Sequence, residues 1–415
     1  MTKLARTLGL AFLMLALLTP AADAAGITTA QEQQRARDEA NRYRSMVGMP
    51  AVSSTSGLNS AAIGHARYVL QTGEHGHYES RTTSQYYIGY APGDRARLYG
   101  YTNDSITENY YMGSLGARGT RTPLVTDNAM QWWMTAIYHR FPIVSPRTEH
   151  VGFGPYYLNG RAVQVLDFGG DYNKTGGVTR WPVTNQVGVG TRLDGESPSP
   201  VAQFGGSFPT GYPVSMTWYR YNANLRYTQM TLVRARDGAN IDGYKLTPGN
   251  DQTKLSYYST SLSFIPQNPL AFSTRYTATF KGSIDGAAFS YQWSFTTMPA
   301  PGRLLESTPA TGASNTPRVP NISLSFSQPV RTYTLVRSPY RGGLDANGVG
   351  ISLVRASDGM EMGISITLPT TRTTKTVTFK PTVTLAPNTR YSAHFTLADA
   401  WGRPYRDAVH FTTQP

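Results

Sequence analysis

Histidines and carboxylates gather between residues 65 and 150, which hold five of the seven histidines in the chain. Imidazole and carboxylate groups bind divalent metal ions and move protons, so a region rich in both is where a site is expected. A pair such as His77-x-Glu79 is weak by itself, because such pairs are often solvated loop residues. The candidate site residues in this stretch are His77, Glu79, Glu108, His139 and Glu149.

Several kinds of chemistry are excluded by what the sequence lacks. The 415 residues contain no cysteine, so disulfides, thiolate metal ligands and a cysteine nucleophile are ruled out. There is no H-E-x-x-H, G-x-S-x-G, Walker or dinucleotide-binding motif. No catalytic residue is therefore assigned from motifs.

The first 24 residues have the pattern of a signal peptide. Lys3 and Arg6 precede an apolar run, Leu8 to Leu18, and Ala22-Asp23-Ala24 is a small-residue cleavage signal. The run is too short for a stable membrane span, and no later stretch is long and apolar enough. We expect a mature chain starting near Ala25, without a transmembrane segment, that is secreted or periplasmic.

The formal net charge is +13, with +3 in residues 25–180 and +9 in residues 181–415. Dispersed positive charge on an exported protein favours attraction to anionic envelope polymers. No Lys/Arg run or basic helix concentrates the charge, so nucleic acid is not expected as a partner.

The site must be positioned by elements that the residue pattern predicts. Residues 27–47 are predicted to be a helix capped by Thr28 or Thr29, and a second helix is predicted from Ser56-Gly57 to Gly73. The second has one apolar face. His65 lies on that face and is interpreted as a packed, hydrogen-bonded core histidine. The apolar face consists of Leu58, Ala61, Ala62, His65 and Val69.

Residues 74–124 are rich in glycine, tyrosine and turn residues and are predicted to be a long ordered loop. Next comes a helix capped by Thr126 or Asp127 that places His139 at its C-terminal end. Two strands, 151–156 and 162–168, are joined by a turn at Asn159-Gly160. Helices followed by an antiparallel hairpin indicate a layered α/β domain over residues 27–170.

After Gly170 the pattern becomes all-strand and repeats itself. Three short segments recur 115 to 121 residues apart, and a Pro-Ala-Pro-Gly linker separates the copies. Two β-sandwich modules are predicted, at 190–299 and 303–415. The recurring segments begin at Thr231 and Ser352, at Leu270 and Leu385, and at Phe295 and Phe411.

Residues 33–170 resemble the CAP superfamily (cysteine-rich secretory proteins, antigen 5 and pathogenesis-related 1) in a cysteine-free bacterial form. The order and spacing of several short motifs carry the resemblance, and the repeat units are similar to bacterial Ig-like modules. The motifs are Asn41-x-Tyr-Arg44, Leu58-Asn59-x-Ala-Ala-x-x-His65-Ala66, Gly76-His77-x-Glu79, Asp94-Arg95, Glu108-Asn109, Trp133-Met134-x-x-x-x-His139-Arg140 and Glu149-x-Val-Gly-x-Gly154.

The resemblance implies an α+β fold: an α-β-α sandwich CAP domain followed by two all-β Ig-like sandwiches. It also implies a cleft in which His77 and Glu108 match family positions, His139 matches the histidine of a bacterial G-H-R motif, and Glu149 precedes the last strand. The second cleft histidine of eukaryotic members falls at about Pro146, so that ligand is missing here.

Two readings of this cleft stay open. His77, Glu108 and His139 could hold zinc or another divalent metal with an open coordination position. Alternatively, the same three residues form a buried hydrogen-bonded network that pins the tyrosine-rich loop to the helix.

Three functions follow. The favoured one is a non-catalytic secreted binding protein, whose cleft takes a lipid-like ligand or an envelope polymer and whose Ig-like modules act as spacer or anchor. The second is a metal-assisted hydrolase of peptide or polysaccharide with Glu108 or Glu79 as base. The third is a surface adhesin in which the β-modules dominate.

Overall fold

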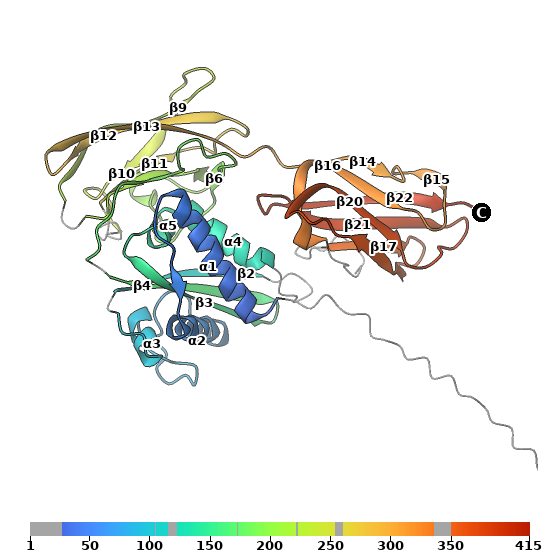
Figure 1. The fold of residues 1–415 in the computed structure, drawn as a ribbon, viewed down its shortest axis with the longest axis horizontal. Helices are drawn as coiled ribbons and strands as arrows, with labels where there is room; N and C mark the ends of the chain where they lie inside the picture. The colour runs from blue at the N-terminus through green and yellow to red at the C-terminus, as the bar shows by residue number, and fades with distance from the viewer. Residues whose placement is uncertain are drawn as a thin grey trace, which may run out of the picture.

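The computed structural model describes residues 27–103, 105–114, 123–171, 173–220, 223–253, 260–335 and 350–415. A mixed helix-and-sheet domain comes first, followed by two all-strand modules, the second of which projects to one side (Figure 1). The expected signal peptide lies outside the described residues. None of the described helices is long and apolar enough to cross a membrane.

The first domain contains the helices α1 Thr29–Met46, α2 Ser56–Thr72, α3 Pro92–Leu98, α4 Pro123–Thr135 and α5 Ile137–Ile143. The start of α1 and the end of α2 lie where the sequence predicts them. Thr28 caps α1, since its hydroxyl accepts the N–H of Gln31 while the Gln31 side chain accepts the N–H of Thr28. Gly73 ends α2 in the left-handed conformation at φ 72°.

One four-stranded sheet lies between these helices. Its strands are β1 Ser53–Ser54, β2 Ser105–Ser114, β3 Thr148–Leu158 and β4 Arg161–Gly170, in the order β1-β3-β4-β2. The turn predicted at Asn159-Gly160 joins β3 to β4, with φ of 49° and 74°. Helices α1 and α4 cover one face and α2 and α3 the other (Figure 1). The α-β-α sandwich predicted from the resemblance is confirmed.

Glycines let α2 approach the sheet closely. A Cβ atom on Gly152 would lie 2.1 Å from the carbonyl carbon of Leu58, and one on Gly154 would lie 2.0 Å from that of Ala62. No side chain fits in that space, so glycine is required at both positions. The Val-Gly-Phe-Gly segment therefore seats α2 against β3.

The alternation of side chains along β4 divides the core into two faces. Val163 and Val165 pack with the α2 side, whereas Leu166 and Phe168 pack with α1 and α4. By the same alternation, Asp167 points toward the α2 side. This strand therefore carries a carboxyl group under α2.

Two predicted elements differ from the structure. The predicted loop 74–124 contains α3 and β2, so Glu108 lies on a strand paired with β4 rather than in a loop. The predicted helix breaks at Ala136, with ψ 134°, into α4 and α5. His139 is consequently in a short buried helix of its own and not at the exposed end of a long one.

The first β-module, residues 179–297, has two facing sheets with strand orders β10-β11-β8-β5 and β13-β12-β9. Its opening strand precedes residue 190, where the sequence prediction placed the module's start. Its strands are β5 Thr179–Trp181, β6 Arg192–Leu193, β7 Thr210–Gly211, β8 Val214–Thr217, β9 Leu225–Arg234, β10 Gly243–Leu246, β11 Ser261–Pro266, β12 Arg275–Ile284 and β13 Ala287–Thr296.

The second β-module, residues 303–413, has sheets ordered β14-β16-β20-β19 and β15-β22-β21-β17-β18. Its strands are β14 Leu304–Thr308, β15 Ala313–Thr316, β16 Ile322–Arg331, β17 Gly350–Arg355, β18 Glu361–Met362, β19 Ile364–Thr367, β20 Thr373–Pro381, β21 Arg390–Ala398 and β22 Pro404–Thr413.

The sequence repeat corresponds to the same local hydrogen bonds in both modules. The hydroxyl of Tyr276 accepts the N–H of Ala271 at 2.9 Å, and the hydroxyl of Tyr391 accepts the N–H of Ala386 at 2.9 Å. A tyrosine tying the start of a strand to the preceding loop is a recurrent feature of Ig-like sandwiches. The two modules are thus variants of one unit.

The cores show how the parts are joined. One continuous hydrophobic core includes Phe153 and Trp133 of the first domain together with Trp181 and Met216 of the first β-module. The second β-module has a separate core of its own. The first domain and the first β-module therefore fold against each other as one body of packed side chains.

Candidate functional site

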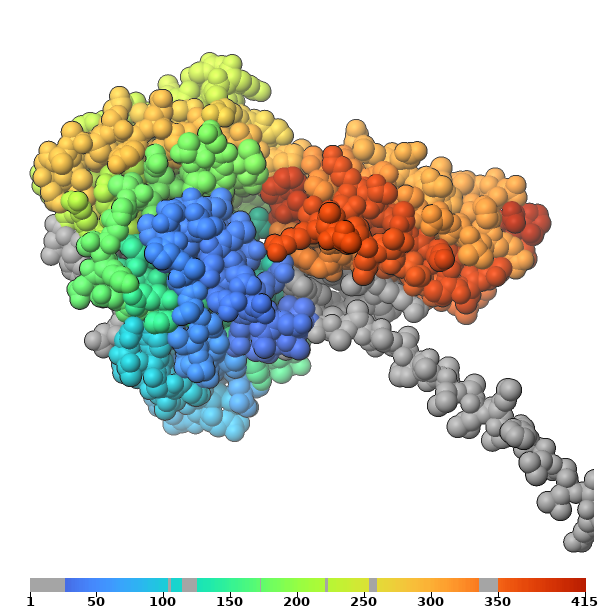
Figure 2. Space-filling view, in the orientation of Figure 1, coloured from blue at the N-terminus to red at the C-terminus, as the bar shows by residue number. Residues whose placement is uncertain are grey.

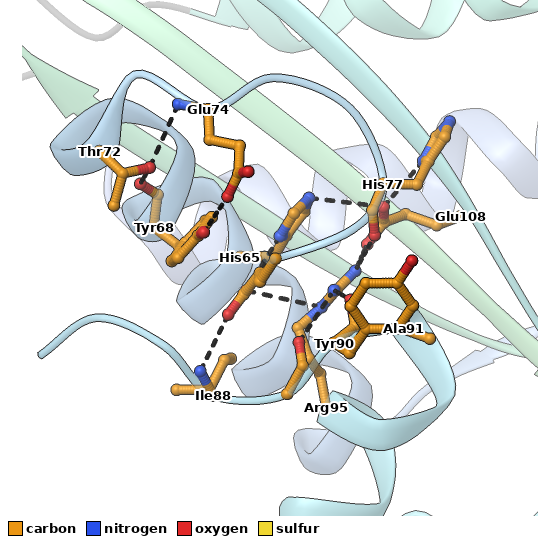
Figure 3. Close-up of polar contacts among 12 residues, drawn as sticks. His65, Tyr68, Thr72, Glu74, His77, Ile88, Tyr90, Ala91, Arg95 and Glu108 are labelled. Carbon is orange, nitrogen blue, oxygen red and sulfur yellow. Dashed lines mark hydrogen bonds and ion pairs between the residues drawn. The ribbon is translucent and has the colours of Figure 1, made fainter. Parts of the chain in front are cut away.

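Five side chains from four elements meet on the α2 face of the sheet, and Figure 3 labels all of them except Glu79. We call His65, His77, Glu79, Arg95 and Glu108 the polar cluster. His65 comes from α2, His77 and Glu79 from the loop after it, Arg95 from α3 and Glu108 from β2. Three of the five were predicted from the sequence as site residues, and His65 was predicted as core.

Glu108 is the centre of the polar cluster. One carboxylate oxygen lies 2.8 Å from Nδ1 of His77 and 3.6 Å from Nε2 of His65, and the other accepts a hydrogen bond from Arg95 at 2.6 Å. Burial by itself would raise the pKa of Glu108, but the charges of His65 and Arg95 and the hydrogen bond from His77 lower it to about 2. Glu108 is therefore ionised at neutral pH.

His65 and Glu79 form a fully buried pair beside it. Nδ1 of His65 lies 3.0 Å from Glu79, and Nε2 lies 2.9 Å from the carbonyl of Gly76. The second oxygen of Glu79 accepts the N–H of Ile88 at 2.9 Å. Oxygen atoms lie against both ring nitrogens, so the ring is held from two sides. The interpretation of His65 as a hydrogen-bonded core histidine is confirmed, and its partners make it part of the cluster.

Arg95 ties the surrounding loop to α3. Its guanidinium is buried and donates to the carbonyls of Tyr90 at 3.2 Å and His77 at 3.1 Å, besides Glu108. The predicted role of pinning the tyrosine-rich loop is thus filled by Arg95 rather than by a second histidine. Its fixed, planar donors suit this use better than a flexible lysine would.

Asp167 is a member of the site that was not predicted from the sequence. It is the cross-strand partner of Glu108 and is fully buried. Burial raises the pKa of Asp167 well above its usual range, and repulsion from Glu108 adds to this effect. The pKa values of the two neighbouring carboxyl groups are therefore shifted in opposite directions, that of Glu108 down and that of Asp167 up. A carboxylate inside the apolar run Val-Gln-Val-Leu-Asp-Phe was the signal available in the sequence.

His77 is the part of the cluster that reaches solvent. Its side chain is 39% exposed, compared with 1% for Glu108. With Nδ1 held by Glu108, Nε2 is the ring nitrogen left for a ligand. Beside it, the rings of Tyr78 and Tyr90 stack at 5.0 Å and are 55% and 53% exposed. Two exposed, adjacent aromatic rings offer a stacking surface to a partner.

His139 lies elsewhere, at what we call the seam between α5 and the first β-module. Its Nδ1 is 3.1 Å from Glu196, and its ring packs on Trp132 at 4.8 Å. Glu196 also accepts the N–H groups of Ile137 at 2.9 Å and Tyr138 at 2.6 Å. The expected His77–Glu108–His139 set is therefore wrong for His139, whose side chain locks α5 to the next module.

Glu149 is also apart from the polar cluster. It is partly exposed and forms an ion pair with Lys174. The neighbouring His150 contacts the hydroxyl of Tyr101 at 3.0 Å. Glu149 thus joins the end of the sheet to the segment that follows it.

The polar cluster does not fit a metal ion as its donors stand. No group of three or more His, Asp or Glu side chains among the described residues is arranged to hold one. The oxygens of Glu108 are already engaged by cationic partners, and a divalent ion there would meet the Arg95 guanidinium. The three expected ligands, including His139, are not gathered into one set.

Comparisons with protein families match two separate parts of the chain. Residues 37–168 match the cysteine-rich secretory protein family, CAP, and residues 299–413 match the bacterial Ig-like domain. No curated protein matches the chain.

Solved structures give distant similarities. An outer surface protein from Borrelia burgdorferi is 14% identical with a TM-score of 0.29, covering 35% of this chain and 97% of that one. An extracellular protein containing an SCP domain from Bacillus anthracis is 18% identical with a TM-score of 0.27, covering 34% of this chain and 41% of that one.

Proposed function

Residues 37–168 form a CAP domain and residues 299–413 a bacterial Ig-like domain, and from this we propose an extracellular binding protein. The CAP domain binds a polar polymer of the cell envelope through His77 and the stacked pair Tyr78 and Tyr90. The β-modules act as a spacer or anchor for the CAP domain. The predicted export of the chain places it where such polymers occur.

The observation that carries this proposal is that the buried carboxylates of the polar cluster are already paired within the domain. Glu79 and Glu108 are 0% and 1% exposed, and their oxygens are held by His65, His77, Arg95 and a backbone N–H. What faces outward is an imidazole and two aromatic rings. Such a surface binds a ligand by stacking and hydrogen bonding.

The polar character of nearby hollows favours a polymer over a lipid. A groove next to the loop after α2 is lined by hydroxyl, amide and guanidinium side chains and one tyrosine ring. A lipid chain would need an apolar lining. The groove residues are Gln71, Thr72, Ser80, Arg81, Thr82, Thr83, Ser84, Gln85 and Tyr86.

Hydrolysis has less support. Glu79 and Glu108, the two carboxylates considered as bases, are buried and fully engaged, so neither reaches a water molecule beside a substrate. Asp167, whose pKa is raised by burial, has no exposed surface. Of these carboxyl groups, Glu108 contacts the His77 ring and fixes its position.

Cosedimentation of the full chain with peptidoglycan sacculi tests the proposal. We expect the wild type to bind and a Tyr78→Ala/Tyr90→Ala variant to bind at least about tenfold more weakly, since stacked rings contribute a few kcal/mol together. Tyr227→Ala is the matched control, because Tyr227 is 40% exposed on the first β-module.

Two results would count against it. If the double variant binds as the wild type does while Tyr227→Ala loses binding, the modules carry adhesion and the CAP surface does not. If the wild type binds phosphatidylglycerol vesicles and not sacculi, the ligand is lipid and the polymer proposal fails.

A further inference from the structure

A second hollow, separate from the polar cluster, lies where all three domains meet. It has a volume of about 520 Å³ and shares no residue with the cluster. Helices α1 and α4, the segment 186–190 of the first β-module and segments of the second β-module form its walls. We call it the junction crevice. In Figure 2 the blue surface of α1 faces the orange-red surface of the second β-module across it. Its size is that of a small-ligand site.

The charges that line the crevice do not balance. Four arginines face two carboxylates, which leaves a net charge of +2. Positive potential focused in a concave site attracts anions. The charged lining residues are Arg35, Arg42, Arg331, Arg372, Glu39 and Asp127.

Neither carboxylate is free to neutralise the excess. Glu39 is engaged by Arg42 at 2.9 Å. Asp127 is 8% exposed and bound by Arg35 at 2.5 Å, by Tyr333 at 2.6 Å and by Arg331. Arg35 and Arg331 thus share one counterion.

Arg372 is the cation with no counterion in this arrangement. It is exposed, and its side chain makes no hydrogen bond or ion pair with the residues that the structure describes. Its backbone carbonyl accepts from Thr332, which a change of side chain leaves intact. A guanidinium held at the mouth of a positive crevice is a ready partner for a carboxylate or phosphate.

The remaining lining suits a sugar ring. Trp401 is half-buried and so close to Gly188 that a Cβ atom there would lie 2.6 Å from the indole nitrogen. Its indole is thereby fixed at the edge of the crevice. Amide and hydroxyl groups of Gln131, Gln186 and Thr373 complete the wall. Aromatic faces with fixed polar groups around them are the ordinary lining of ligand sites.

We propose that the junction crevice binds a hexose-sized sugar carrying a carboxylate or phosphate group. The arginines take the anionic group and Trp401 takes the ring. Because each domain supplies part of the wall, the bound ligand holds the second β-module in place against the CAP domain.

Isothermal titration calorimetry of the full chain with trigalacturonate and with glucose 6-phosphate tests this. At least one probe should bind, and its affinity should fall as salt rises. Arg372→Ala and Trp401→Ala should each weaken binding about tenfold, the effect of losing one charge-assisted contact or one stacked ring. Arg390→Ala is the control, an exposed arginine of the same module outside the crevice. Binding of the uronate alone identifies a carboxylate ligand, and binding of the sugar phosphate alone a phosphate ligand.

The proposal is overturned if neither anionic probe binds, if neutral maltotriose binds as tightly as they do, or if Arg372→Ala binds like Arg390→Ala. These variants leave the CAP surface at Tyr78 untouched, so the outcome is separate from that of the sacculus assay.

Discussion

The polar cluster and the seam each place a buried carboxylate against a histidine, but the partners come from different places. Glu108 is met by side chains of the CAP domain alone, and its histidine is 39% exposed. Glu196 comes from the first β-module, and the histidine that it meets is 9% exposed. The same chemical pair therefore serves a surface in one region and joins two domains in the other. The two pairs have the same residue types and differ in how far the histidine is exposed to solvent.

The seam is reinforced by contacts that the cluster lacks. Arg140 donates to the carbonyl of Pro213 at 3.1 Å, and the hydroxyl of Tyr138 donates to Asp251 at 2.8 Å. The hydrophobic core continues across it. The second β-module, by comparison, meets the CAP domain through the polar contacts of Asp127. The first β-module is thus part of the CAP domain's fold, while the second is attached to it.

The largest expected effect is on the cluster. Glu108→Gln removes the nearer of the two carboxylates that pair with the buried Arg95, leaving only Glu79 at 3.9 Å, and should lower the free energy of unfolding by about 3 kcal/mol at pH 7. The pKa of Glu108 falls from 4.5 to about 2 in the fold. Its contribution is therefore complete above pH 4.5 and is lost as pH falls toward 2.

Urea unfolding of wild type and Glu108→Gln at pH 7 and pH 3 measures this, with the exposed Glu306→Gln as control. The difference between the two proteins should shrink at pH 3. An equal difference at both pH values would mean that the ionised carboxylate is not what stabilises the cluster.

A smaller loss is expected at the seam. Glu196→Gln replaces one acceptor oxygen by an amide that faces backbone N–H groups, and should cost about 2 kcal/mol. Because the core is shared, calorimetry should show the CAP domain and first β-module unfolding in one transition that moves down, while the transition of the second β-module stays. Separate shifts of the CAP domain and first module would show that the seam does not couple them.

The smallest effect has the opposite sign. Asp167 has its pKa raised, so the folded state favours the neutral acid, and the stability that it contributes below pH 3.8 is lost as pH rises. Asp167→Asn keeps the group neutral at all pH values, so it should stabilise the fold at pH 7 and have little effect at pH 3. Exposed Asp194→Asn is the control in urea unfolding. Destabilisation by Asp167→Asn at pH 7 would contradict a raised pKa for Asp167.

Sequence reasoning succeeded where the signal is local. The Thr28 cap and the Gly73 stop set helix boundaries within one turn of chain, and the apolar face of α2 follows from its own spacing. Strand β2 was missed because Ser-Ile-Thr-Glu-Asn-Tyr-Tyr-Met-Gly-Ser, although it contains the strand-favouring residues Ile, Thr and Tyr, lies in a stretch rich in glycine and turn residues. It pairs with β4, whose partner residues lie 47 to 65 positions later in the chain (Ser114↔Arg161 to Ser105↔Gly170).

The candidate site was predicted only in part, because some of its contacts join residues that are far apart in the sequence. His77, Glu79 and Glu108 do come together, as the motifs of the family resemblance implied. His139 did not join them, because its partner Glu196 is on another module and no local pattern announces that contact. Asp167 belongs to the site only through its register with Glu108. Long-range pairing decided both cases.

Sacculus binding by His77→Asn and His139→Asn, compared in one cosedimentation assay, tests the placement of the binding surface most directly. We expect at least about tenfold weaker binding for His77→Asn, whose ring nitrogen faces the ligand, and wild-type affinity for folded His139→Asn. Equal loss in both variants, or loss in His139→Asn alone, would contradict the placement of the binding surface at the polar cluster.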